Sequence, residues 1–219
     1  MTKASSVEKH FDKVSTSYDA GKVRYSFYYS SLKKLLLDLI GKNNNVFEFG
    51  CGTGDLLTSL NPKVGYGMDI STNMVKIARS KHKRKSVTFS IALPKRKFDY
   101  IFMSDVIEHL EKPQSTFSQI SKLMNKDSKF IITMANPKWE VFLMIWEKLG
   151  WKMPEGPHRR MDYRDIKILL AKSSMKIVKH DYRLLVPVKI PVVTKFANVY
   201  LERFLKRLAF IEYFVAVKS

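Results

Sequence analysis

The chain has 219 residues, 45% of them hydrophobic, which is typical of one globular domain with a single core. Lys and Arg number 39 against 20 Asp and Glu, so the formal net charge is +19 at pH 7. This excess indicates contact with nucleic acid, an anionic membrane surface or an acidic substrate, although it also suits solubility alone. The single cysteine excludes an internal disulfide framework and a cysteine-cluster metal site.

The sequence also predicts where the protein resides. No stretch of about eighteen uncharged apolar residues is present that would span a bilayer. The first ten residues lack the apolar core that a signal peptide needs. We therefore expect a cytoplasmic protein that can lie on a membrane surface as a peripheral protein without crossing the membrane.

The first two thirds of the chain alternate between helices and strands. Apolar residues at helical spacing predict helices over residues 7–18 and 25–40, which form an N-terminal cap within 1–42. Five apolar runs predict strands at residues 46–49, 64–70, 86–91, 98–105 and 129–134. Helical patterns separate most of these runs, so the expected fold is α/β, with a doubly wound, mostly parallel sheet in a single domain spanning 1–219.

The last third departs from this alternation. Strands are expected at residues 175–185 and 212–218, and the final strand is predicted to pair antiparallel with the one before it, as an edge. Insertions at 137–160 and 186–210 each contain an apolar-faced helix. Such helical caps cover a pocket, lie in a membrane interface or pack in the core, and the sequence leaves all three open.

A glycine-rich turn follows the first strand. Val46–Phe49 passes directly into Gly50, Gly52 and Gly54, and glycine is needed where backbone takes positive φ or approaches a ligand closely. Asp69 ends the second strand about twenty residues later, the distance at which an acid binds ribose hydroxyls in a dinucleotide-type unit. The alternative is that Asp69 caps the helix after it.

Residues 48–54 read Glu-Phe-Gly-Cys-Gly-Thr-Gly, which resembles motif I of class I S-adenosylmethionine-dependent methyltransferases. Asp69 falls at the ribose-binding acid of that family, and the expected seven-stranded sheet with an antiparallel last strand is similar to its Rossmann-like fold. Residues 104–110, Ser-Asp-Val-Ile-Glu-His-Leu, resemble its fourth-strand motif. The Asp-x-x-Glu-His-Leu form is most similar to the ubiquinone-biosynthesis O-methyltransferase group.

The resemblance implies S-adenosylmethionine as cofactor. The glycines would pass under its methionine and ribose parts, Glu48 would lie near its amino group, and Ile70 and Met74 would sandwich its adenine. Relatives commonly carry an acid after the third strand, and here backbone around Ile91 is expected to replace it. The implied cofactor contacts are Tyr18, Arg24, Glu48, Gly50, Cys51, Gly52, Gly54, Asp69, Ile70, Met74, Ile91, Ser104 and Asp105.

Two histidines are candidates for a general base. His109 follows the fourth strand, and an imidazole that titrates near pH ~6.5 suits removal of a phenolic or hydroxyl proton. His158 is the second choice, and a purely positional mechanism without a base is the alternative. Trp139, Trp146 and Arg159 are the residues assigned to the methyl acceptor.

The sequence favours transfer of a methyl group to an oxygen or nitrogen of a hydrophobic small-molecule or lipid-like acceptor, at an anionic membrane surface. The rival is a nucleic-acid (RNA) or protein methyltransferase, for which the +19 charge would be the electrostatic footprint. Against it, the fourth-strand motif lacks the Asn/Asp-Pro-Pro-aromatic form of many base-methylating enzymes. A non-catalytic cofactor-binding subunit is a further alternative.

Overall fold

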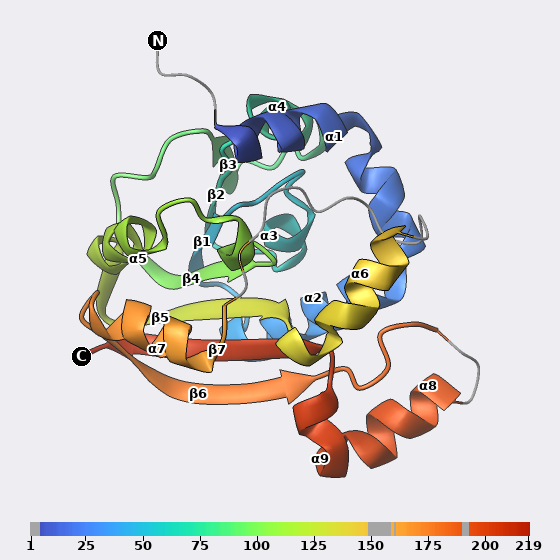
Figure 1. The fold of residues 1–219 in the computed structure, drawn as a ribbon. Coiled ribbons are helices and arrows are strands. Elements are labelled where there is room, and N and C mark those ends of the chain that lie inside the picture. Colours follow the sequence, from blue (N-terminus) through green and yellow to red (C-terminus); the bar gives the residue numbers. More distant parts are fainter. Residues whose placement is uncertain (1–4, 149–158, 160, 190–192) are drawn as a thin grey trace.

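The computed structural model describes residues 5–148, 159, 161–189 and 193–219. Within these residues, seven strands form one sheet in the order β3-β2-β1-β4-β5-β7-β6 (Figure 1). The strands are β1 (Asn45–Phe49), β2 (Val64–Met68), β3 (Val87–Ser90), β4 (Phe98–Ser104), β5 (Met124–Ala135), β6 (Met175–Arg183) and β7 (Ile211–Lys218). The predicted mostly parallel sheet with an antiparallel last strand is confirmed.

The prediction that β7 is an edge strand is wrong. β7 lies between β5 and β6 and pairs antiparallel with both. Its first six residues, from Ile211 to Ala216, are buried, so their side chains need cover on both faces and their backbone needs partners on both sides. β6 takes the edge instead, and most of its residues are partly or fully exposed.

Nine α-helices and four 3₁₀- or π-helical turns surround the described sheet. The α-helices are α1 (Ser6–Arg24), α2 (Ser26–Ile40), α3 (Asp55–Ser59), α4 (Thr72–Lys81), α5 (Pro113–Lys122), α6 (Glu140–Lys148), α7 (Tyr163–Ala171), α8 (Val193–Phe196) and α9 (Glu202–Leu205). The turns are η1 (Ile107–His109), η2 (Pro137–Trp139), the π-helical η3 (Ala197–Leu201) and η4 (Lys206–Leu208). The helix predicted within the insertion at 186–210 is therefore a succession of short helical pieces.

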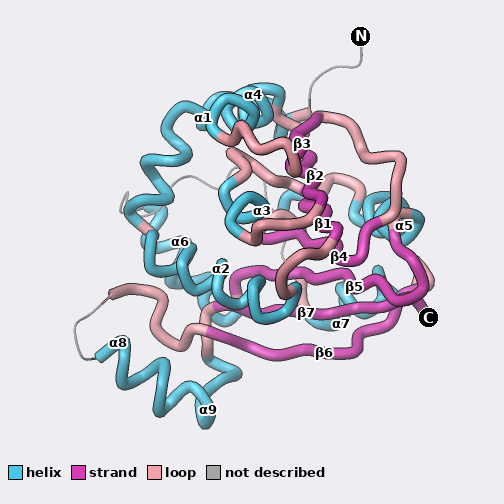
Figure 2. Tube along the Cα trace, turned by 180° about the vertical axis from the view of Figure 1, so that it is seen from behind, coloured by secondary structure: helices cyan, strands magenta, loops and turns pink. Residues whose placement is uncertain are grey.

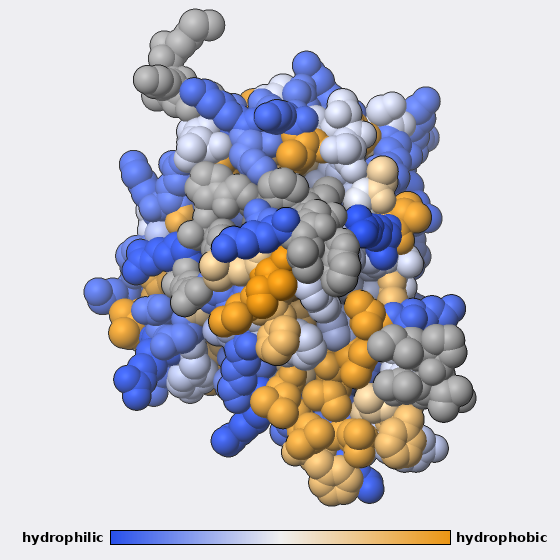
Figure 3. Space-filling model, turned by 45° about the vertical axis from the view of Figure 1, so that its right-hand side comes forward, coloured by the Kyte–Doolittle hydropathy of each residue, from blue (hydrophilic) through white to orange (hydrophobic). Residues whose placement is uncertain are grey.

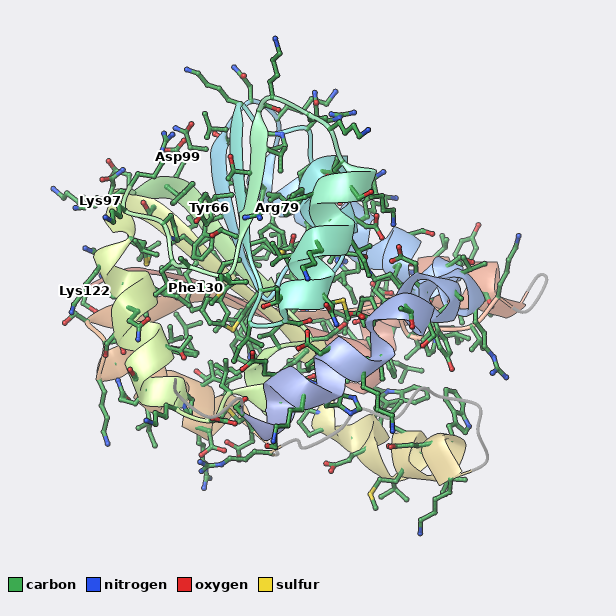
Figure 4. The ribbon with its side chains drawn as sticks, turned by 90° about the horizontal axis from the view of Figure 1, so that it is seen from above. Tyr66, Arg79, Lys97, Asp99, Lys122 and Phe130 are labelled. Carbon is green, nitrogen blue, oxygen red and sulfur yellow. The ribbon has the colours of Figure 1, made fainter. Side chains whose placement is uncertain are left out.

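Helices cover both faces of the sheet. Alternate strand residues point to opposite faces, so Val46 packs with the buried side chains of α2, α3 and α4, whereas Phe47 packs with those of α5 and α7. Phe130 on β5 meets Phe117 on α5 with ring centroids 5.5 Å apart, and this contact fixes the helix to the sheet (Figure 4). The core therefore has two layers, one on each side of the sheet.

The two helical caps lie beside these layers, and Leu143 of α6 packs against the buried cluster that contains Val46. Figures 1 and 2 both place α6, α8 and α9 on the same side of the molecule, away from α5. α1 runs beside α4, near the ends of the central strands (Figure 1). Among the described residues, none of the helices combines the length and apolarity that a membrane crossing requires.

Candidate active site

The glycine-rich loop between β1 and α3 is held against the neighbouring strand. The backbone N–H groups of Gly50 and Cys51 donate to the carbonyl of Met68 at 2.7 and 2.9 Å. Gly50 has φ +76°, and a Cβ there would lie 2.4 Å from a methyl carbon of Val106, so both conformation and space require glycine. The loop thus turns tightly and leaves backbone facing the end of the sheet.

Asp69 ties this loop to the start of α4. Its Oδ2 accepts from the backbone N–H of Gly52 at 2.7 Å, and its Oδ1 accepts from that of Ser71 at 2.9 Å. Burial raises the pKa of Asp69. Ser71 caps the helix, since its Oγ accepts from the backbone N–H of Met74 at 3.1 Å, so the alternative that Asp69 is the helix cap is wrong.

A first cavity of about 320 Å³ opens beside the loop and Asp69. It collects eight of the predicted cofactor contacts, from α1, the loop, β2, α4 and the end of β4. Its walls are formed by Ser5, Val7, Phe11, Tyr18, Phe49, Gly50, Gly52, Met68, Asp69, Ile70, Met74, Ser104, Asp105, Val106, His109, Leu110, Glu111, Lys112 and Thr116.

The first cavity fits S-adenosylmethionine. Its volume lies in the range of small-molecule sites, roughly 300–1,000 Å³. The buried Oγ of Ser104 has no hydrogen-bond partner among the described residues, which leaves it available to a ligand. Asp69 gives the cavity a carboxylate, while Ile70 and Met74 give it an apolar wall. These features suit a molecule with hydroxyl groups and a flat apolar ring.

Five predicted cofactor contacts lie outside the walls formed by described residues. The Glu48 carboxylate accepts from the backbone N–H of Leu57 at 3.1 Å, and burial raises its pKa to about 8. The others are Cys51, which is buried, Gly54, which precedes α3, and Arg24 and Ile91, which are exposed.

α1 closes one side of the first cavity through polar contacts. Asp12 accepts from Ser71 Oγ at 2.5 Å, at the start of α4. The Thr53 hydroxyl donates to Asp19 Oδ1 at 2.6 Å, and it accepts from Lys22 Nζ at 3.1 Å. α1 is therefore clamped to both the glycine-rich loop and α4.

Further ion pairs extend this clamp. Lys81 Nζ lies 2.8 Å from Asp19 and 2.7 Å from Asp55, and Lys22 lies 3.3 Å from Asp55. Sequence reasoning missed these residues. Asp19 and Lys22 lie beyond the helix predicted at 7–18, and Asp55 and Lys81 belong to α3 and α4, so no spacing in the sequence connected the four residues.

A second cavity of about 190 Å³ adjoins the first, and the two share Phe11, Tyr18, Asp105 and His109. Aromatic rings dominate it. Its walls are formed by His10, Phe11, Val14, Tyr18, Tyr25, Tyr28, Tyr29, Asp105, Glu108, His109, Ala135, Leu143, Trp146, Pro187, Val188 and Phe210. The chemistry of the site is therefore expected where the two cavities meet.

Partly buried side chains stand at this junction, among them Tyr18, Asp105 and His109. Tyr28 Oη donates to Asp105 Oδ2 at 2.7 Å. Burial, followed by the nearby Asp105 carboxylate, raises the pKa of Tyr28 well above its usual value, and burial also raises that of Tyr18. Both phenols therefore stay protonated and can donate hydrogen bonds. His109 packs edge-on against Phe11, with ring centroids 5.4 Å apart.

The predicted acceptor residues are placed differently from one another. Trp146 lines the second cavity. Trp139 packs on Phe210 with ring centroids 5.5 Å apart, and its Nε1 donates to the carbonyl of Leu208 at 2.8 Å. Arg159 is exposed and lines a separate cavity of about 70 Å³. The second-choice base, His158, lies outside the described residues.

Comparison with known proteins agrees with this geometry. A family described as methyltransferase domain matches residues 23–180. The chain therefore belongs to this family and is a methyltransferase.

The relatives include the ubiquinone biosynthesis O-methyltransferase of Pelagibacter ubique, which is 28% identical over 131 residues, or 53% of this chain and 54% of that enzyme. The chain thus matches about half the length of that relative. Magnesium protoporphyrin IX methyltransferase from Synechocystis, solved with bound SAH, aligns with a TM-score of 0.57 and 20% identity over 91% of this chain and 85% of that one.

A more similar structure comes from Haloferax volcanii. It is the complex between the Trm112 methyltransferase activator and its methyltransferase partner. The match has a TM-score of 0.75 and 19% identity, and it covers 97% of both chains. At these identities the two structures show the shared fold.

Proposed function

We propose that this chain transfers a methyl group from S-adenosylmethionine to an oxygen or nitrogen of a hydrophobic small molecule. The second cavity carries this proposal, because it is lined by aromatic rings and joins the first cavity at the predicted base. A cavity of about 150 Å³ holds one benzene ring, so 190 Å³ suits roughly one ring with small substituents.

S-adenosylmethionine is the cofactor, and when bound it supplies a methyl group on a positively charged sulfur. Gly52, Asp69 and Ser104 would hold it in the first cavity. Transfer is an in-line displacement, so the chain mainly has to align the acceptor and exclude water. The clamped helix α1 would exclude water on one side, because its residues Phe11 and Tyr18 line both cavities.

The residues at the junction act on the acceptor. His109 is placed to take the proton of an acceptor hydroxyl, because its ring lines both cavities. The Tyr28 hydroxyl fixes one oxygen of Asp105, and this carboxylate then orients the polar group of the acceptor. The rest of the second cavity recognises the apolar part of the acceptor by contact with aromatic rings.

Three measurements test the proposal. Calorimetry is expected to show binding of S-adenosylmethionine, and labelled methyl groups are expected to appear on single-ring phenols or amines. His109→Gln should reduce turnover by roughly 10²–10⁴-fold while leaving the cofactor Kd unchanged. Absence of cofactor binding by the folded wild type would contradict the proposal and favour a non-catalytic subunit.

The Haloferax match supports a second candidate, a nucleic-acid or protein methyltransferase that works with an activator subunit. It is supported by a match over 97% of a methyltransferase solved in complex with such an activator, and by the +19 net charge. A salt-dependent gel shift with total RNA separates the two candidates. RNA binding that weakens steeply with salt, together with methylated RNA, would favour the second.

A further inference from the structure

Large hydrophobic side chains are exposed on the two helical caps. Phe204 is 71% exposed, Val141 64% and Val199 59%. We call this surface the apolar face and define it by Val141, Phe142 and Ile145 on α6, with Phe196, Val199 and Phe204 on the segment from α8 to α9. Isolated exposed side chains are ordinary on a folded protein, whereas a contiguous apolar patch indicates an interaction site.

The two halves of the apolar face belong to one surface. The Nδ2 of Asn136, just before η2 and α6, donates to the carbonyl of Ala209 at 2.8 Å, so the start of α6 is joined to the end of the segment that carries α9. Figure 3 shows hydrophobic side chains gathered over the lower part of the molecule on this side, with hydrophilic ones beside them. Both halves of the apolar face therefore lie on the same side of the molecule.

Positive charge accompanies the apolar face. Residues 183–208 contain six Lys or Arg and one acidic residue, Glu202. The Glu202 carboxylate accepts from the backbone N–H of Leu184 at 2.8 Å, so it is occupied within the fold. Arg203 and Arg207 are exposed. This combination of apolar side chains and basic residues complements the interface of an anionic bilayer, where apolar groups enter and cations meet lipid headgroups.

The apolar face also adjoins the second cavity. Leu143 and Trp146 of α6 line that cavity, as do Pro187 and Val188 of the segment before α8. Val188 is itself 39% exposed. The same two parts of the chain therefore form both the exposed face and one wall of the second cavity.

We propose that the apolar face docks on an anionic lipid bilayer, and that the methyl acceptor reaches the second cavity from that bilayer. The exposed apolar side chains and the positive charge of the surface support the docking. The delivery of the acceptor rests on the proposed function. A ring-sized cavity beside a membrane-facing surface suits an acceptor whose remaining apolar part stays in the lipid.

Vesicle flotation tests the docking. The full chain is mixed at low salt with vesicles of phosphatidylcholine and phosphatidylglycerol, or of phosphatidylcholine alone. Each Lys or Arg near an anionic surface strengthens binding by about fivefold, so the anionic vesicles should bind at least roughly tenfold more tightly and lose this advantage at high salt. Phe204→Glu and Phe142→Glu should each weaken binding by about tenfold.

Ile168→Glu is the matched control, because Ile168 is 52% exposed on α7, outside the apolar face. It should bind vesicles like the wild type, and circular dichroism checks that all variants are folded. Wild-type protein that stays off anionic vesicles, or variants that float equally well, would overturn the docking. A dimer in light scattering that Phe204→Glu dissociates would also overturn it, since a second copy would then cover the face.

The same preparation separates this inference from the proposed function. Binding of S-adenosylmethionine without flotation overturns the docking and leaves methyl transfer intact. Flotation without cofactor binding overturns the methyl transfer and leaves the docking intact. If anionic vesicles raise the methylation rate of a ring compound carrying an alkyl tail, but not that of the same ring without the tail, delivery from the bilayer is supported.

Discussion

Replacing Asp69 by asparagine tests whether its two carboxylate oxygens hold the cofactor in the first cavity. Both carboxylate oxygens already accept backbone N–H groups, from Gly52 at 2.7 Å and from Ser71 at 2.9 Å. An asparagine has one oxygen, so its amide N–H must face one of these donors. Leaving a buried N–H unpaired costs about 1–3 kcal/mol of folding stability. The loss of a charged acceptor for the ribose hydroxyls acts on binding, because hydrogen bonds to charged groups contribute about 1.5–3 kcal/mol. We therefore expect the Kd for S-adenosylmethionine to rise roughly 10–100-fold.

Titration calorimetry measures this Kd, and urea unfolding measures the stability of the same variant. Asp99→Asn is the control, because Asp99 Oδ2 also accepts a backbone N–H, that of Asn45 at 2.9 Å, where β1 begins. That point lies at the opposite end of β1 from the glycine-rich loop, so the control should leave the Kd unchanged (Figure 4). A folded Asp69→Asn protein that binds within about threefold of the wild type would refute the ribose assignment.

Four further substitutions test other parts of the fold and of the site. Gly41→Ala, at φ +72° and ψ −165° with its nearest neighbour at 3.8 Å, should lose about 1–3 kcal/mol of stability from strain alone. Gly50→Ala adds a clash at 2.4 Å to similar backbone strain, so its stability in urea unfolding should fall further than that of Gly41→Ala. It should also bind the cofactor more weakly. Burial raises the Glu48 pKa to about 8, so between pH ~4.5 and about 8 the native state keeps a proton that the unfolded chain releases. The free energy of unfolding should therefore fall as pH rises through this range, by up to about 1.4 kcal/mol per pH unit. Glu48→Gln should abolish that part of the slope in unfolding at several pH values, and an unchanged slope would contradict it. Tyr28→Phe removes the 2.7 Å hydrogen bond to Asp105 beside the second cavity, so turnover should fall while the cofactor Kd measured by calorimetry stays within about threefold.

The structure divides the site into a part that binds the cofactor and a part that meets the acceptor. Gly50, Gly52 and Asp69 belong to the first cavity alone, whereas Tyr18 and His109 line both cavities. Variants of the first group should therefore change cofactor affinity. Variants of His109 should change the rate of transfer, and this difference allows the two parts to be measured independently.

The candidate site was only partly accessible from sequence. The glycines and Asp69 could be predicted because they lie at strand ends, and parallel strands bring their carboxyl ends to one edge. Glu48 shares their motif, but its carboxylate accepts a hydrogen bond from the backbone N–H of Leu57 in α3. The direction of a side chain near the end of a strand depends on the elements packed around that strand, so the motif alone did not determine where the Glu48 carboxylate points.

The sequence by itself determined the sheet and the position of the cofactor cavity, because the periodicity of apolar residues and the conformational needs of Gly50 are local properties. Only the tertiary structure decided the position of β7 between β5 and β6, because the apolar pattern of a buried strand does not specify which strands it pairs with. It also created the clamp between Lys22 and Thr53, and the second cavity, where Tyr28, Trp146 and Phe210 come together from distant segments. Contacts between such segments depend on how the helices pack against the sheet, which no local pattern encodes.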